Sequence, residues 1–242
     1  MRFLVFLWLS FVAVTSTAHA QYSEWKHSGS IWILMTPEGA DLPESAAVRD
    51  FPVLVRLHRD FFPFSEAAKD GRDIRFSSGE EPLAFEVERC DVEAGTASIW
   101  VRIPEIIGND RQELEIHWGN SDATSESNGK AVFNQSNGYI SVWHLGDEVR
   151  DVVGTLKSDD KGTSRTTGMI GDARYFPGGK GVFCGDDITS FPIGSESHST
   201  QAWFRSDSSR GRILSWGKVQ MWYQSPSVFG RHPGCTVMLP PM

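Results

Sequence analysis

The fold is decided by a stretch of alternating side chains, Ile99-Trp100-Val101-Arg102-Ile103. Its branched apolar residues recur at every second position, which is typical of a β-strand with one face in a core and the other in water. Three further stretches alternate in the same way, at residues 53–57, 83–88 and 114–118. Turn signals separate the stretches, among them Ser78-Gly79, Ala94-Gly95 and Gly108-Asn109. The sequence therefore predicts an all-β protein that begins with an antiparallel β-sandwich.

Residues 1–20 have the pattern of a signal peptide. Arg2 supplies a positive charge, residues 3–14 are almost entirely apolar, and residues 18–20 (Ala-His-Ala) form a small-x-small cleavage site. This apolar run is too short for a transmembrane helix, and no later window is long and apolar enough for one. We expect a mature chain that starts at Gln21, lacks a membrane span, and is secreted, periplasmic or attached to the cell surface.

Charge and cysteine content exclude two classes of protein. The chain has 23 Lys and Arg against 31 Asp and Glu, a net charge of −8, and its basic residues are scattered among acids. This pattern argues against a nucleic-acid partner, because phosphate backbones require clustered positive charge. The three cysteines are Cys90, Cys184 and Cys235. They allow at most one disulfide, whose pairing stays open, and they lack the spacing of a zinc site.

A second β region is expected after a polar boundary. Residues 119–138 are mostly small and polar, and we place the domain boundary after residue 135, between a first domain at 21–135 and a second at 136–242. Candidate strands in the second domain are Tyr139–Leu145, Ala173–Phe176, Thr200–Arg205, Arg212–Trp216 and Val219–Tyr223. From about residue 225 the chain lacks alternation, which predicts an irregular tail. The expected helix is a turn or two near residues 65–69, capped by Ser65.

Five short motifs occur in a recognisable order in the first half. They are residues 70–76 (Asp-Gly-Arg-Asp-Ile-Arg-Phe), 83–88 (Leu-Ala-Phe-Glu-Val-Glu), 97–104 (Ala-Ser-Ile-Trp-Val-Arg-Ile-Pro), 118–120 (Trp-Gly-Asn) and 131–133 (Ala-Val-Phe). In this order they resemble the exported bacterial family called domain of unknown function 2341. The resemblance covers about residues 25–135. It implies a β-sandwich and no established activity.

A second resemblance concerns the other half. Its motifs are residues 142–145 (Val-Trp-His-Leu), 167–176 (Thr-Gly-x-x-Gly-Asp-Ala-x-x-Phe), 202–205 (Ala-Trp-Phe-Arg) and 213–217 (Ile-Leu-Ser-Trp-Gly). They are similar to the start of a concanavalin A-like, laminin-G-type lectin or glucanase domain. That resemblance implies a jelly-roll sandwich with more strands than can be drawn here. We therefore expect a partial, truncated concanavalin A-like domain.

Two sets of carboxylates are candidates for chemistry. Glu86 and Glu88 alternate with apolar residues, so both side chains point to one face of a strand, which we interpret as the wet face. The alternative is an acid and nucleophile pair for glycoside hydrolysis. The candidate calcium ligands are Asp70, Asp73, Asp186 and Asp187. No other cofactor is expected, and no catalytic residue is assigned.

Tryptophans supply the candidate ligand-binding residues, because exposed aromatic rings can stack on sugar rings. The tryptophans in apolar stretches are expected to pack in a core: Trp143, Trp203 and Trp216. Those in polar surroundings are expected to be exposed and to bind ligand: Trp25, Trp32 and Trp222. The sequence thus predicts an exported, non-enzymatic binding protein for a glycan or another cell-surface component. The alternatives are a structural or assembly module of an envelope complex and a polysaccharide-degrading enzyme.

Overall fold

The structure is a computed structural model, and the part of the chain that it describes has several gaps. It covers residues 22–154, 156–177, 179–184, 189–192, 195–205, 213–214, 216 and the backbone of 234–238. Several expectations lie outside these residues: the signal peptide at 1–20, the strand at 219–223, Trp222, Asp186, Asp187 and the side chain of Cys235.

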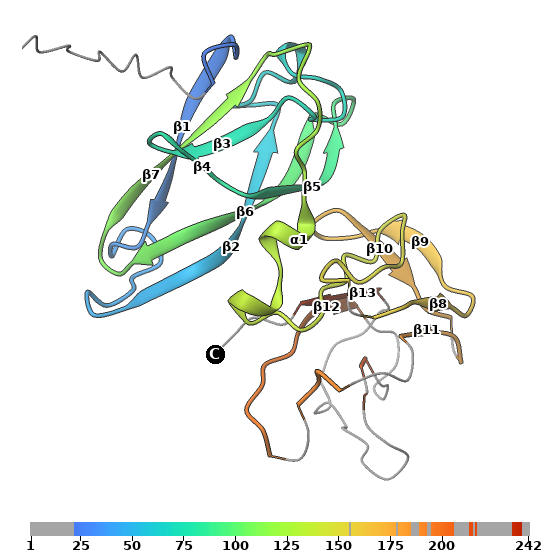
Figure 1. The fold of residues 1–242 in the computed structure, drawn as a ribbon. Helices are drawn as coiled ribbons and strands as arrows, with labels where there is room; N and C mark the ends of the chain where they lie inside the picture. The colour runs from blue at the N-terminus through green and yellow to red at the C-terminus, as the bar shows by residue number, and fades with distance from the viewer. Residues whose placement is uncertain are drawn as a thin grey trace, which may run out of the picture.

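Two antiparallel sheets form a sandwich over residues 27–118 (Figure 1). The first sheet has the strand order β1-β7-β3-β4, and the second has the order β2-β6-β5. The strands are β1 (His27–Leu34), β2 (Ala47–His58), β3 (Arg75–Ser78), β4 (Glu81–Pro82), β5 (Phe85–Asp91), β6 (Thr96–Ile107) and β7 (Arg111–Trp118). The all-β sandwich predicted from the alternation is confirmed.

The core of the sandwich consists of the alternating apolar residues. Ile99 and Val101 of β6 are fully buried and share one cluster with Phe76 of β3 and Ile116 of β7. Complete burial of such a side chain is worth about 1.5–3 kcal/mol relative to exposure in water. The inward face of each alternating strand is therefore the one that the sequence predicts.

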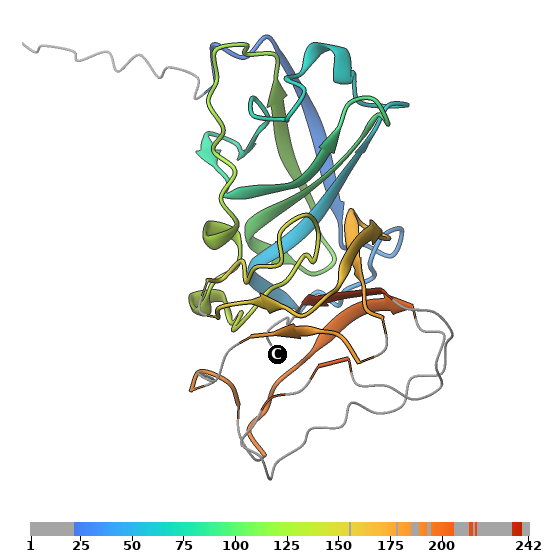
Figure 2. The same ribbon diagram turned by 90° about the vertical axis from the view of Figure 1, so that its right-hand side faces the viewer.

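The outer face of the second sheet is covered, although the alternation alone predicts a wet face. Trp100 projects from β6 on this face into a second cluster with Val132 and Phe133. Helix α1 (Gly129–Val132) lies against β5 and β6 and brings these residues onto the sheet (Figures 1 and 2). We call the contact between this outer face and residues 129–172 the seam. The division of the chain into two domains after residue 135 stays a prediction. The residues that form the seam lie on both sides of that position.

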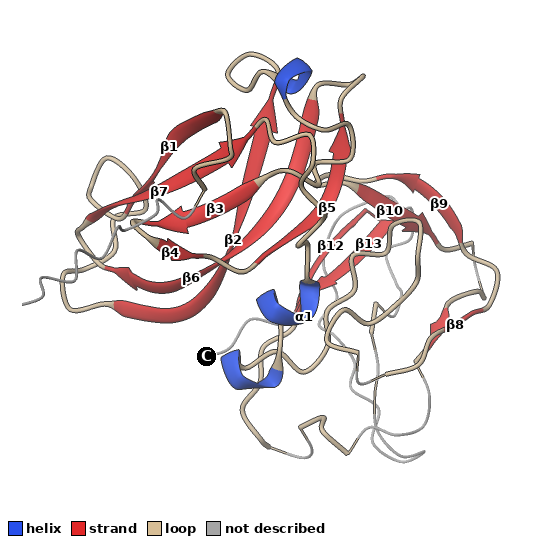
Figure 3. Cartoon of the chain, turned by 45° about the horizontal axis from the view of Figure 1, so that its top comes forward, coloured by secondary structure: helices blue, strands red, loops and turns tan. Residues whose placement is uncertain are grey.

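Short strands and loops make up the remainder, which we call the second region, from residue 139 onward (Figure 3). One sheet has the order β12-β13-β10-β9, and β11 pairs with β8. The strands are β8 (Asp159–Asp160), β9 (Ser164–Thr167), β10 (Asp172–Tyr175), β11 (Val182–Phe183), β12 (Gln201–Arg205) and β13 (Gly234–Met238). Strands at two of the expected places, β10 and β12, are confirmed.

Four expectations for secondary structure are wrong. Tyr139–Leu145 is a loop with one bridge residue, Trp143, because it closes on the loop that follows: the Val142 N–H donates to the Asp151 carboxylate, and the Val142 carbonyl accepts from the Val152 N–H. The described residues of 212–216 are not in a strand. The tail expected to be irregular contains β13, whose ladder with β12 and β10 uses backbone groups and needs no alternation. The helix near residue 65 is a 3-10 turn, η1 (Phe64–Glu66), with no side-chain cap.

Helical structure instead appears inside the expected boundary. Asn128 caps α1 by accepting a hydrogen bond from the backbone N–H of Ala131. A second 3-10 turn follows, η2 (Gln135–Asn137), and the Asn137 amide donates to the backbone carbonyl of Asp50 on β2. A sequence of small polar residues can thus be ordered by capping and by contacts with a sheet. Within the described residues, no helix is long and apolar enough to cross a membrane.

Candidate functional site

The seam contains a cleft of about 260 Å³ with an unusual floor. Glu86, Glu88 and His144 lie there with side chains that are 7%, 6% and 13% exposed. His144 Nε2 is 2.9 Å from Glu86 Oε2, and His144 Nδ1 is 3.6 Å from Glu88 Oε2. The imidazole thus stands between two buried carboxylates. We call these three residues the seam triad.

The interpretation of Glu86 and Glu88 as solvated charges is wrong. Both point to the outer face of β5, as the alternation predicts, but residues of the second region cover that face. Glu86 lies opposite Trp100 in the register of β5 and β6, and Trp100 Nε1 donates a hydrogen bond of 2.6 Å to Glu88. Burial of these carboxylates follows from a contact with residues more than fifty positions away along the chain.

A β-bulge in β5 adds a third charged side chain to this face. The register with β6 shifts between Val87 and Arg89, so that Arg89 comes to lie opposite Ser98. Ser98 itself faces the seam, where its hydroxyl donates to the backbone carbonyl of Ile170. Bulges of this kind redirect side chains next to functional sites. Here the bulge turns the Arg89 guanidinium toward β10 of the second region.

Arg89 connects the sandwich to the hairpin of β9 and β10. Its guanidinium donates to Asp172 at 2.8 Å and to Asp91 at 2.9 Å. Asp172 also accepts from Arg165 at 2.6 Å. The preceding residue, Gly171, lies so close to the seam triad that a Cβ there would be 3.0 Å from Glu88 Oε1. Gly171 therefore allows the hairpin to approach Glu88 closely, and Asp172 binds the hairpin to Arg89 of the sandwich.

A closed loop positions His144. The buried Asp151 carboxylate accepts hydrogen bonds from the backbone N–H groups of Val142, Val153 and Leu156. Leu145, next to His144, has φ 55°, a left-handed conformation that is strained for a bulky side chain. Such strain persists only where surrounding structure enforces it, and it is concentrated at functional sites.

Aromatic rings enclose the imidazole on two sides. Trp100 stacks on His144 with 6.3 Å between ring centroids and 16° between planes, and Phe133 meets it edge-on at 5.9 Å. These rings exclude water, which strengthens the interaction of His144 with its carboxylates. His144 Nδ1 is buried and has no hydrogen-bond partner in the described residues, so its attraction to Glu88 at 3.6 Å is through charge.

The pKa values of the triad reflect burial and mutual charge. Burial lowers the pKa of His144, but the hydrogen bond and charge of Glu86 and the charge of Glu88 outweigh it, so the pKa is raised overall. Burial raises the pKa of Glu88, and the negative charges of Glu86 and Asp172 add to this effect. The positive charge of His144 and the Trp100 hydrogen bond lower it in part. Both groups therefore hold their protons more tightly than usual.

The remaining candidate carboxylates have structural partners. Asp73 is buried, and its oxygens accept from the backbone N–H groups of Ala68 and Gly119. Asp70 is paired with Arg72 at the surface. No group of three or more His, Cys, Asp or Glu side chains suited to a metal occurs in the described part of the chain. Calcium binding by Asp70 and Asp73 therefore has no support from this arrangement.

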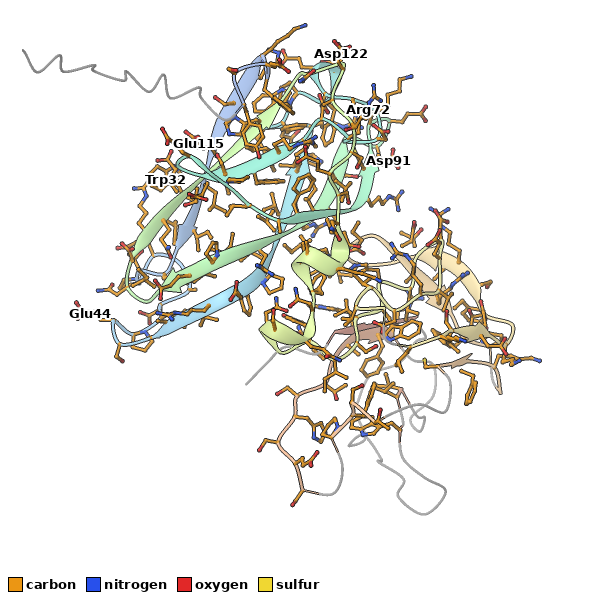
Figure 4. All side chains as sticks on the ribbon, in the orientation of Figure 1. Trp32, Glu44, Arg72, Asp91, Glu115 and Asp122 are labelled. Carbon is orange, nitrogen blue, oxygen red and sulfur yellow. The ribbon has the colours of Figure 1, made fainter. Side chains whose placement is uncertain are left out.

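The exposure of the tryptophans differs in part from the prediction. Trp25 is half-buried, and its indole N–H donates to the backbone carbonyl of Asp73. Trp32 is 43% exposed on β1, on the side of the sandwich away from the second region (Figure 4). Trp143 is buried as expected, but Trp203 is 49% exposed on β12, because it occupies an outward position of that strand. Trp216 is half-buried.

Cys90 and Cys184 are both free thiols. Burial raises the pKa of each to about 11, and nearby aspartates contribute. A thiol with such a pKa stays protonated at neutral pH and is a poor nucleophile.

Comparison with known proteins gives one family match, over part of the chain. Residues 70–140 match the family model described as a domain of unknown function, DUF2341. This segment contains β3 to β7, α1 and η2, and it includes Glu86, Glu88 and Trp100 but ends before His144. No curated protein and no solved structure matches the chain. The family resemblance is thus confirmed over this segment, and the concanavalin A-like resemblance stays a prediction.

His144 was not among the candidates expected from the sequence, and neither were the cleft residues Asp147, Glu148, Arg150 and Asp172. His144 belongs to none of the histidine motifs used by metal enzymes, and Glu86 lies 58 positions away. One signal was available: His144 stands between Trp143 and Leu145 in an apolar stretch. A polar ring in such a stretch requires a buried partner.

Proposed function

We propose that the chain is an exported, non-enzymatic binding protein that holds a glycan or another hydroxyl-rich cell-surface component at the seam cleft. The observation that carries this proposal is the polar lining of the cleft. Exposed Asp147, Glu148 and Arg150 surround its rim above the seam triad. Carboxylates accept hydrogen bonds from hydroxyl groups, and a guanidinium donates them. The volume of about 260 Å³ is close to the lower end of small-molecule sites, roughly 300 Å³.

The geometry of the triad favours binding over glycoside hydrolysis. A glycosidase needs two carboxyl groups that flank the scissile bond, with space for a sugar or a water between them. Here the His144 ring stands between Glu86 and Glu88, and the Trp100 indole N–H donates a hydrogen bond to one oxygen of Glu88. Both carboxylates are thus engaged by the protein itself. This arrangement supports a structural role for the triad beneath a binding cleft.

Carbohydrate binding through a concanavalin A-like second domain is part of the same proposal. The sheet that contains β9, β10, β12 and β13 is compatible with such a domain, and Asp172, the first residue of β10, contributes to the cleft. Trp32 offers a second place for a sugar ring, since it is exposed, although the Arg111 guanidinium lies 4.1 Å from its ring centroid.

A glycan array, run with and without calcium, tests the proposal. We expect binding by the unmodified chain and about a tenfold loss of affinity in a variant with Asp147→Asn and Glu148→Gln, because each removes a charged acceptor. The matched control carries Glu80→Gln and Glu81→Gln, two exposed glutamates at the β3–β4 turn. If only Trp32→Ala abolishes binding, the ligand binds at β1 and not at the cleft. Release of sugar products would show an enzyme, and silence on every glycan would contradict the ligand class.

A further inference from the structure

The seam triad joins two parts of the chain through titratable groups alone. Glu86 and Glu88 belong to β5 of the sandwich, whereas His144 belongs to the loop that begins the second region. The side chains are nearly buried, and the distances from the imidazole nitrogens to the two carboxylates are 2.9 and 3.6 Å. Their protonation therefore determines the charge that the seam must bury.

The protonated imidazole offsets one of the two carboxylate charges, so the net charge of the triad falls from −2 to −1. An imidazolium carries a donor on each nitrogen and can face Glu86 with one and Glu88 with the other. A neutral imidazole carries no positive charge, so the two nearly buried carboxylates lie close together with no cation between them, and Glu88 keeps only the Trp100 hydrogen bond. Uncompensated charge of this kind is costly to bury. The site is thus compatible with a closed seam mainly when His144 is charged.

The other charges around the triad do not replace His144. Arg150, from the same loop, is mostly exposed and paired with Glu148 at 2.9 Å. Arg89, from β5, is engaged by Asp91 and Asp172. Asp172, from β10, adds negative charge near Glu88. From β6 and from the residue after α1, the triad meets the uncharged rings of Trp100 and Phe133.

We propose that Glu86, Glu88 and His144 form a proton-dependent latch, which holds the second region against the sandwich at acidic and neutral pH and weakens as the pH rises. The latch is a property of the seam and does not depend on the proposed ligand. Where the cleft binds a glycan, the latch also regulates the shape of that cleft.

Both titrations act in the same direction. The pKa of His144 is raised, so its stabilisation is complete below its ordinary value of 6.5 and is lost as the pH rises through the value in the folded chain. The pKa of Glu88 is also raised, so its contribution likewise favours the seam at low pH and fades as the pH rises above 4.5 through the folded value. Raising the pH therefore weakens the latch.

The test is a pH titration followed by NMR on the whole chain. The Cε1–H signal of His144, assigned by its absence in His144→Gln, reports its pKa directly. The Val142 and Val152 amides close the loop that contains His144. Their hydrogen-exchange protection, divided by that of the amides of β2 and β6, measures how tightly the seam is closed. We expect this relative protection to fall between pH 6 and pH 9, by about tenfold for each unit by which the pKa exceeds its ordinary value.

His117 is the matched control, since its side chain is also 13% exposed and lies near a carboxylate, Glu115. Burial lowers the pKa of His117, against the charge of Glu115, so its pKa shift is opposite in direction to that of His144. His117→Gln should leave the pH dependence of the seam unchanged, whereas His144→Gln should abolish it. The proposal is overturned if His144 titrates at or below 6.5, or if seam protection in the unmodified chain is independent of pH. The titration of the unmodified chain decides the matter even if a variant fails to fold.

Discussion

Replacing Trp100 by alanine is expected to lower the free energy of unfolding by about 3–5 kcal/mol, the range for large aromatic truncations in a core. Trp100 is buried on the outer face of β6, where it contacts Phe133 and stacks on His144. Its removal leaves a cavity and also deprives the buried Glu88 carboxylate of a donor. Urea denaturation followed by circular dichroism measures the loss.

The control for Trp100→Ala is Trp32→Ala, at a tryptophan of the opposite sheet that is 43% exposed. It loses mainly a surface contact with Arg111, so the cost should be about 1 kcal/mol or less. Equal losses for the two variants would mean that the outer face of the second sheet is not a core.

Phe133→Ala is expected to cost a similar amount, about 3–5 kcal/mol. Phe133 follows α1, is fully buried, and packs edge-on against Trp100 and Tyr139 with centroids 5.5 and 5.2 Å apart. The effect would be large for a residue in a segment whose composition predicts a linker. Differential scanning calorimetry should show a lower melting temperature with no change in the fold at low temperature.

An exposed phenylalanine provides the comparison for this variant. Phe61 is 69% exposed in the turn after β2, so Phe61→Ala should change stability by no more than about 0.5 kcal/mol. A loss below 1 kcal/mol for Phe133→Ala would show that residues 129–138 do not pack on the sheet.

The sandwich could be predicted from the sequence because its strands are amphipathic. Ile99, Val101 and Ile103 alternate with less apolar neighbours, and that period depends only on the geometry of a strand. The second region was harder to predict, since its order depends on individual contacts such as the three backbone N–H groups bound by Asp151. Contacts of that kind leave no period in a sequence.

Half of the candidate site could be predicted, and the missing half has a physical explanation. The shared face of Glu86 and Glu88 follows from their spacing, but their burial depends on which segment covers that face. Trp100 was the available clue, because a large aromatic side chain opposite a row of core residues indicates a strand with two covered faces. The β5 bulge, which turns Arg89 toward Asp172, has no comparable signal in the sequence.

Residues 129–172 cover the outer face of the β2-β6-β5 sheet and bury the triad there. Hydrogen exchange of the Trp100 indole N–H tests this arrangement most directly, because that group is bonded to Glu88 beneath the seam. Trp32, assigned like Trp100 by substitution with phenylalanine, supplies an exposed indole in the same sample. At pH 6 we predict exchange at Trp100 to be slower than at Trp32 by about a hundredfold or more, which corresponds to an opening free energy of about 3 kcal/mol. Equal exchange rates at the two indoles would contradict the account.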